Sequence, residues 1–136
     1  MTEHSYQIKT YNENKEYNQP HYFLLNKGLN SGRPMNEPCP NCYVITTETE
    51  ERRNTLFYLC LSLHSGKFFN KFLVGSVIPF IRIGDTRKVL NTALQNYEKD
   101  QWELKVQKLV KIVEYEENLK YQLTVVAQLK LALLRT

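Results

Sequence analysis

Three cysteines and one histidine have the residue types and spacing of a metal site. Cys39 and Cys42 form a Cys-x-x-Cys pair, and Cys60 and His64 follow with three residues between them. Three thiolates and one imidazole bind zinc in many structural sites. On a helix Cys60 and His64 would lie one turn apart on the same face, but on a strand they would lie about 13 Å apart, too far for one ion. The pattern thus suggests zinc as a cofactor, held by Cys39, Cys42, Cys60 and His64. The alternative is that no cofactor binds and the cysteines are small buried apolar side chains.

The Cys-x-x-Cys pair could instead be a redox site. Thioredoxin-like sites place such a pair at the N-terminus of a helix, which lowers the pKa of the first thiol. Here the pair runs into the strand-like residues 43–45. None of the three histidines belongs to a recognisable nucleophile, metallohydrolase or nuclease motif. We therefore predict that the protein is not an enzyme and has no catalytic residues.

The cysteine pair closes an unusual segment, residues 26–42, which contains two glycines and three prolines. This composition excludes an ordinary helix or strand, and loops of this kind on a folded scaffold commonly bind something. Gly28 and Gly32 do not form a P-loop, because the Lys-Ser/Thr ending is missing. Lys27 and Arg33, with the backbone amides beside the glycines, could still hold a phosphate of RNA or DNA, but a turn with solvated charges is the more common arrangement. We predict a recognition surface with the binding residues Lys27, Asn30, Arg33 and Asn41.

A second candidate surface mixes basic and aromatic residues. Phe68, Phe69 and Phe72 lie next to Lys67 and Lys71 in the sequence. Exposed aromatic side chains beside cations can stack on nucleic-acid bases. Three phenylalanines this close together are more often core residues, so both interpretations stay open. The basic residues assigned to this second surface are Lys67, Lys71, Arg82, Arg87 and Lys88.

Glycine and proline divide the elements that must position these residues. All five prolines and all five glycines lie between Pro20 and Gly84. A single domain with a β-rich part, 1–84, and a helical part, 85–136, is therefore expected. Alternating or continuous apolar residues predict strands at 5–10, 21–25, 42–46 and 76–83. Pro79 would place the last of these at a sheet edge or a bulge.

The segment 55–63 fits both helical and strand spacing. Thr47 followed by Glu50 has the form of a capping box, and Gly66 suits a helix C-terminus, so a helix is favoured. Asp85 can cap the next helix, which runs to about Tyr97. The apolar residues of that helix that should face inward are Val89, Leu90 and Leu94.

A last helix from about Asp100 carries the longest apolar pattern. Its apolar residues recur at steps of three and four for more than thirty residues, and such a helix would be about 50 Å long. A domain of this size cannot cover that length, so part of the stripe should pack on the sheet and the rest should meet the preceding helix, a second copy or another protein. We predict an α+β fold, a small, mainly antiparallel sheet with a short middle helix and two C-terminal helices, the last long. The stripe consists of Trp102, Val106, Leu109, Ile112, Tyr115, Leu119, Leu123, Val126, Leu129 and Leu133.

Composition indicates an ordinary globular protein. The chain is 42% hydrophobic and 24% charged, and its net charge of +4 is spread over both halves. Nucleic-acid-binding domains normally concentrate their basic residues more strongly. No run has the length of a signal peptide or of the ~18 apolar residues of a membrane span. We expect a cytoplasmic protein that does not contact a membrane.

Two stretches resemble a known family. They are residues 21–51, reading HYFLLNKGLNSGRPMNEPCPNCYVITTETEE, and residues 73–83, reading LVGSVIPFIRI. Together they resemble a domain family of unknown function from small proteins of Bacteroidetes and their phages and mobile elements. The strings Asn-Lys-Gly-x-Asn-Ser-Gly and Cys-Pro-Asn-Cys are the most specific parts. No activity is assigned to this family, so the resemblance carries over no catalytic residues.

The setting that the resemblance implies favours one function. Small non-enzymatic proteins of phages often bind and block host machinery, including RNA-guided nucleases, whatever their fold. We therefore expect an anti-CRISPR-type inhibitor in the host bacterial cytoplasm. Its partner would be a host protein or ribonucleoprotein complex, bound at the effector or at its RNA. The alternatives are a stand-alone RNA- or DNA-binding accessory protein and a structural protein that self-associates through the long helix.

Overall fold

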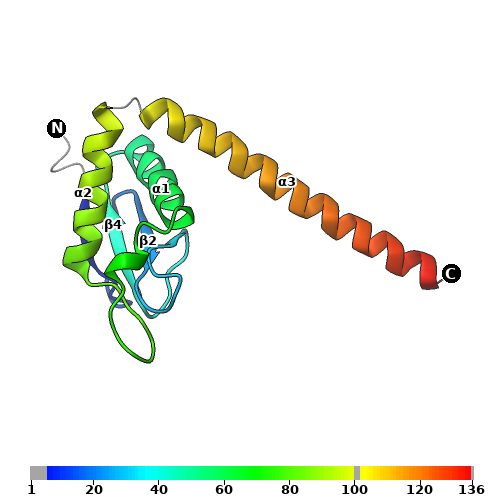
Figure 1. Cartoon of the computed structure of the whole chain (residues 1–136), viewed down its shortest axis with the longest axis horizontal. Coiled ribbons are helices and arrows are strands. Elements are labelled where there is room, and N and C mark those ends of the chain that lie inside the picture. The colour runs from blue at the N-terminus through cyan, green and yellow to red at the C-terminus, as the bar shows by residue number, and fades with distance from the viewer. Residues whose placement is uncertain (1–5, 100–101, 136) are drawn as a thin grey trace.

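The computed structural model describes residues 6–99 and 102–135, and the side chains of 97–99 and 102–103 are not described. Four strands form one antiparallel sheet in the order β1-β4-β2-β3. Helices α1 and α2 cover one face of this sheet, and α3 extends away from them (Figure 1). This architecture confirms the predicted α+β fold. The elements are β1 (Gln7–Thr10), β2 (His21–Leu25), β3 (Pro34–Met35), β4 (Cys42–Thr46), α1 (Glu50–Ser65), a 3-10 turn (Asn70–Phe72), α2 (Ile83–Lys99) and α3 (Trp102–Arg135).

The main core lies between the sheet and the two shorter helices. Successive side chains of a strand point to opposite faces, so Tyr22 and Leu24 of β2 point together toward the helices. They pack there with Leu56, Leu59 and Leu90, all of which are fully buried. The inward positions predicted for α2 are confirmed, since Val89, Leu90 and Leu94 are all buried.

The other face of the sheet carries a smaller aromatic cluster. Phe23 and Val44 are buried there, and Tyr11 and Tyr17 from the loop between β1 and β2 pack against them. The ring of Tyr11 meets that of Phe23 edge-on at 5.5 Å between centroids, and His21 meets Phe23 at 5.4 Å. The polar loop after β1 thus folds over the sheet and shields its second face.

Helix α1 confirms the helical interpretation of residues 55–63, but its N-cap differs from the prediction. The cap is Thr49, whose hydroxyl accepts a hydrogen bond from the backbone N–H of Arg52 at 3.1 Å. Thr47, the predicted cap, is buried, and its hydroxyl donates to the carbonyl of Thr49. Gly66 ends the helix as predicted, since its N–H donates to the carbonyl of Ser62.

The predicted strand 76–83 is wrong. Val74 and Phe80 form an isolated pair of backbone hydrogen bonds, and the intervening Val77 is 90% exposed. The chain after Phe80 is instead fixed by the main core, where the hydroxyl of Tyr43 donates to the carbonyl of Ile81 at 2.6 Å. Helix α2 then begins at Ile83, and the short strand β3 takes the edge position beside β2.

Some boundaries predicted from the sequence fall on residues outside the described ranges. Ser5, the expected start of the first strand, and Asp100, the expected start of the last helix, are among them, as is the side chain of Trp102. Within 6–99 and 102–135, no helix combines the length and the apolar character needed to cross a membrane.

Candidate functional site

The three cysteines of the predicted zinc site are divided between the two faces of the sheet. Cys42 and Cys39 belong to the outer cluster, whereas Cys60 is fully buried in the main core on the other side. The helix that the zinc site required does form, but it turns Cys60 away from the cysteine pair. Among the described residues, no group of three or more His, Cys, Asp or Glu side chains could hold a metal ion. The predicted set of Cys39, Cys42, Cys60 and His64 is therefore not assembled.

The buried thiols are held in their neutral form. The Cys42 thiol donates to the carbonyl of Cys39 at 3.1 Å, and the Cys60 sulfur lies 3.0 Å from the hydroxyl of Tyr22. Burial raises the pKa of Cys42 from 9.0 to about 11 and that of Cys60 from 9.0 to about 12. Metal binding and nucleophilic attack both need the thiolate. These two cysteines thus fit the alternative of small apolar side chains.

Four backbone amides of the loop 26–42 donate hydrogen bonds to carbonyl groups of the protein itself. Gly28 donates to the carbonyl of Pro79 at 2.6 Å, and Gly32 donates to the carbonyl of Leu25 at 2.7 Å. Ser31 and Arg33 also donate to backbone carbonyls within the loop. A phosphate cradle needs free amides that converge on the ligand. These four amides are already paired within the protein, so they do not offer the phosphate cradle that the sequence left open.

All nine predicted binding residues are exposed, but they do not all line one groove. Lys71 and Lys88 line the same groove, whereas Arg87 lines a separate hollow beside Tyr6. Arg33 lies close enough to His64 for its charge to lower the pKa of that imidazole, after the larger effect of burial. The exposed residues are Lys27, Asn30, Arg33, Asn41, Lys67, Lys71, Arg82, Arg87 and Lys88.

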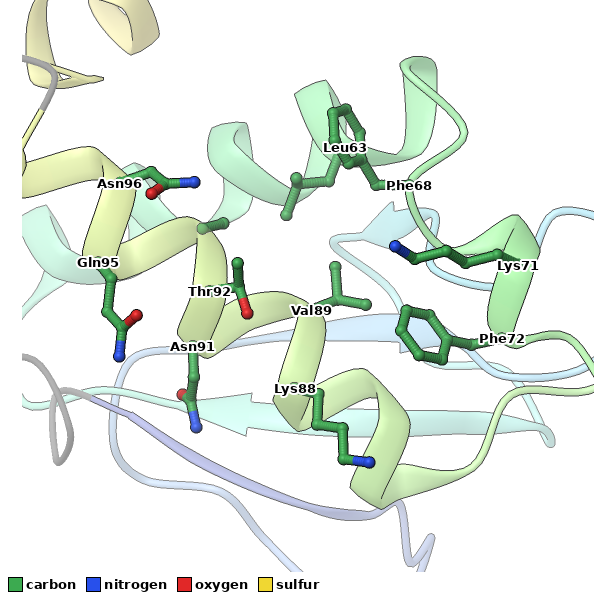
Figure 2. A pocket seen from close by; sticks show the side chains of 11 residues that line it. Leu63, Phe68, Lys71, Phe72, Lys88, Val89, Asn91, Thr92, Gln95 and Asn96 are labelled. Carbon is green, nitrogen blue, oxygen red and sulfur yellow. The ribbon is translucent and has the colours of Figure 1, made fainter.

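The groove shared by the two lysines lies between α2, the end of α1 and the 3-10 turn. It has a volume of about 580 Å³, and Leu63, Val89 and Phe72 contribute apolar side chains to it (Figure 2). The ammonium of Lys71 lies 5.3 Å from the centre of the Phe72 ring. Of the three phenylalanines considered for base stacking, Phe69 is fully buried and Phe68 is 55% exposed. The cluster is thus partly core and partly groove wall.

Arg53 has a structural role that no sequence motif indicated. Its guanidinium lies 4.9 Å from the ring of Phe57 and 5.6 Å from that of Tyr22. Its Nε donates to the carbonyl of His21 at 2.9 Å, and a terminal nitrogen donates to the side-chain oxygen of Asn36. One side chain of α1 therefore connects the helix to β2 and to the segment after β3.

Most of the large hydrophobic side chains that are exposed lie on α3. The helix contacts α1 and α2 near its start, where Val106 is buried and Leu109, Val110 and Val113 are half-buried. Beyond this point it projects as a single helix (Figure 1). We define the arm as residues 112–135. Its large hydrophobic side chains that are exposed are Ile112, Tyr115, Leu119, Tyr121, Leu123, Val126, Leu129, Leu131, Leu133 and Leu134.

Comparison with known proteins places this architecture in a family. Residues 8–136 match the Family of unknown function (DUF6943). The chain belongs to this family. Searches among curated proteins and among solved structures find no significant match to the chain. The predicted membership of a family of unknown function is thereby confirmed.

The range of the match bears on the arm. Because it extends from β1 through the whole of α3, the arm is part of the DUF6943 domain and not a segment appended to it. The family match therefore covers the sheet, the loop 26–42, the groove and the arm.

Proposed function

We propose that the protein is a non-enzymatic binding protein that assembles with a partner through the arm. The observation that carries this proposal is the row of exposed apolar side chains on a helix that projects from the body. Exposed apolar patches beyond a few hundred Å² mark interaction sites in soluble proteins. A projecting helix also gains most of its stability from packing an apolar face, and a partner would supply that packing.

The disposition of the reactive side chains supports a non-enzymatic role. Cys42 and Cys60 lie on opposite faces of the sheet as neutral thiols. Burial and, after it, the charge of Arg33 lower the pKa of the His64 imidazole. General acid–base and nucleophilic catalysis need such groups to converge on one reacting atom. These groups are separated, whereas the exposed surfaces suit recognition.

Differently tagged copies of the protein, co-expressed in bacteria and recovered with mild crosslinking, would test this proposal. The arm variant carries Leu119→Glu and Val126→Glu, and the loop variant carries Lys27→Ala and Arg33→Ala. We expect the wild type and the loop variant to recover an arm partner, either the second tagged copy or another protein. The arm variant should recover neither. Equal recovery by the arm variant would show that the arm is not the binding surface.

Within this class, the first biological role that we propose is inhibition of a host RNA-guided nuclease in the bacterial cytoplasm. It is supported by the setting that the family resemblance implies and by the exposed side chains of Lys27 and Arg33 on the loop. Copurification from cells that carry the candidate nuclease would test it. Retention of the nuclease by the wild type and its loss in the loop variant are expected. If nothing is retained, the inhibitor role should be abandoned, while the assembly role of the arm is unaffected.

Direct binding of RNA or DNA is the second candidate, because Lys71 and Lys88 flank the same partly apolar groove. Such binding would weaken steeply as salt is raised, since phosphate contacts release counterions. Fluorescence anisotropy with labelled single-stranded RNA at low and high salt would measure this. Affinity that does not change between wild type and Lys71→Ala with Lys88→Ala would exclude the groove as a nucleic-acid site.

A further inference from the structure

We propose that the partner of the arm is the arm of a second copy of this chain, paired with it as an antiparallel two-helix coiled coil. This inference rests on the proposed function and names its partner. It follows from the pattern of apolar residues on the arm, from the face of α3 that the body leaves exposed, and from the distribution of charge along the arm.

The arm carries a heptad pattern. From Ile112, apolar residues recur at alternating steps of three and four, the spacing of the a and d positions of a coiled coil. Continuing the same register toward the N-terminus places Lys105 and Lys108 at these positions, so the apolar pattern begins at Ile112. The single polar residue within it is Gln122. The seven positions are Ile112, Tyr115, Leu119, Gln122, Val126, Leu129 and Leu133.

This seam lies on a different face of α3 from the one that contacts the body. Val106, Leu109 and Val113 share the face that packs on α1 and α2. At 100° per residue, the seam is centred roughly 160° around the helix from that face. Its members are accordingly exposed, with Leu119 at 46% and Leu129 at 64%. The body therefore leaves the seam open to a partner.

Charge along the arm is what identifies the partner as a second copy. Glu114, Glu116 and Glu117 lie near its start and are followed by Lys120, whereas Lys130 and Arg135 lie near its end. An antiparallel pair brings the acidic part of each arm beside the basic part of the other. A two-fold axis makes both contacts identical, as in an isologous dimer. The arm is thus complementary to itself in charge, and such complementarity selects partners and orientation.

A specific register satisfies both the seam and the charges. In antiparallel coiled coils, a positions face d positions of the partner and e positions face e positions. With Leu119 opposite Leu129 of the second copy, Tyr115 lies opposite its Leu133. Glu116 then faces Lys130, since both occupy e positions. The two bodies lie at opposite ends of the paired arms.

The seam is large enough for a dimer in reversible equilibrium with its monomers. From Ile112 to Leu133 the helix rises about 32 Å, and two such seams would bury on the order of 1,000 Å² in total. That area is at the lower limit of specific interfaces. We therefore expect a dimer that dissociates at about micromolar concentrations.

Sedimentation equilibrium of the full chain from about 1 to about 200 μM tests the dimer directly, because mass action shifts its population with concentration. The wild type should change from monomer to dimer over this range. Leu119→Glu with Val126→Glu places four carboxylates in the seam and should raise the dissociation constant more than tenfold. Tyr121→Glu with Gln128→Glu adds the same charge away from the seam and should leave the dissociation constant within about twofold. Circular dichroism of each variant checks that the helices are retained.

Disulfide trapping tests the orientation, in a Cys39→Ser background to remove the partly exposed native thiol. Neither Leu119→Cys nor Leu129→Cys alone should form a covalent dimer, because neither position faces itself in the antiparallel register. A mixture of the two variants should crosslink under mild oxidation. Self-crosslinking of Leu119→Cys would instead indicate a parallel pair and overturn the proposed arrangement.

The outcomes separate this inference from the proposed function. The wild type could stay monomeric at the highest concentration while its arm still captures a different protein. This result would overturn the proposal that the partner is a second copy, but it would leave the assembly role of the arm intact. If the wild type stays monomeric and the arm variant also recovers every protein that the wild type recovers, both the pairing of two copies and the assembly role of the arm are overturned.

Discussion

Gly32 offers the sharpest test of how the loop is attached to the body. Gly28 and Gly32 both have left-handed backbone conformations, with φ of +99° and +98°. A Cβ at Gly32 would lie 2.3 Å from Cδ2 of Phe69, whereas a Cβ at Gly28 would meet nothing within 4 Å. Alanine at the two positions therefore introduces the same backbone strain but a steric clash at only one of them.

The expected losses of stability follow from the backbone strain and the steric clash. A non-glycine residue in the left-handed region costs about 1–2 kcal/mol, and the lower entropy of the unfolded alanine chain offsets about 0.4–1 kcal/mol of that. The Phe69 ring is fully buried in the main core, so it cannot move aside without repacking. Overpacking of this kind costs about 1–3 kcal/mol more. We expect Gly28→Ala to destabilise by about 1 kcal/mol and Gly32→Ala by about 2–4 kcal/mol.

Urea and thermal unfolding followed by circular dichroism would measure both variants. For a chain of this size, 1 kcal/mol corresponds to a change of about 4 °C in Tm. Phe69→Leu provides a double-mutant cycle, because a smaller side chain should relieve the clash and reduce the additional cost of Gly32→Ala. Equal destabilisation by Gly28→Ala and Gly32→Ala, with no coupling to Phe69, would refute the proposed contact between loop and core.

Three other substitutions test the α1 N-cap, the contacts of Arg53 and the buried Cys60 thiol by the same unfolding measurements. Thr49→Ala should cost about 1 kcal/mol, because it removes the side-chain acceptor of the α1 N-cap. Arg53→Ala should cost about 1–3 kcal/mol through lost ring contacts and hydrogen bonds, and Arg52→Ala, which leaves those contacts in place, is its control. Because folding raises the pKa of Cys60 from 9.0 to about 12, the unfolded chain loses the thiol proton first. Stability should therefore fall as pH rises from 9 to 12, and Cys60→Val should reduce that fall.

Local patterns in the sequence predicted the regular elements well. The expected strands 21–25 and 42–46 coincide with β2 and β4, because their apolar residues and flanking turn residues lie within a few positions of each other. The inward face of α2 followed from helical periodicity alone. These features depend on neighbours in the chain, which the sequence displays directly.

The candidate site depended on contacts between residues that are distant in the sequence, and the sequence predicted these contacts less well than the regular elements. The zinc hypothesis treated Cys42 and Cys60 as neighbours, but a sheet lies between them. Strand alternation decides the face on which Cys42 lies, and the packing of α1 decides the face of Cys60. Likewise, residues 76–83 have the composition of a strand but form only isolated bridges, in which Phe80 pairs with Val74 and with Lys27.

The apolar stripe on the last helix shows how a correct periodicity can combine two surfaces. Its members Val106, Leu109, Ile112 and Tyr115 follow one another in three steps of three residues. Each such step falls about 60° short of a full turn, so three of them rotate the stripe by about 180° around the helix. The stripe therefore starts on the face that packs against the body and passes to the opposite face, where its later members recur at steps of three or four residues. One pattern in the sequence thus joins an intramolecular contact to the seam that we propose to be intermolecular, and the run of three-residue steps from Val106 to Tyr115 carries it from the first face to the second.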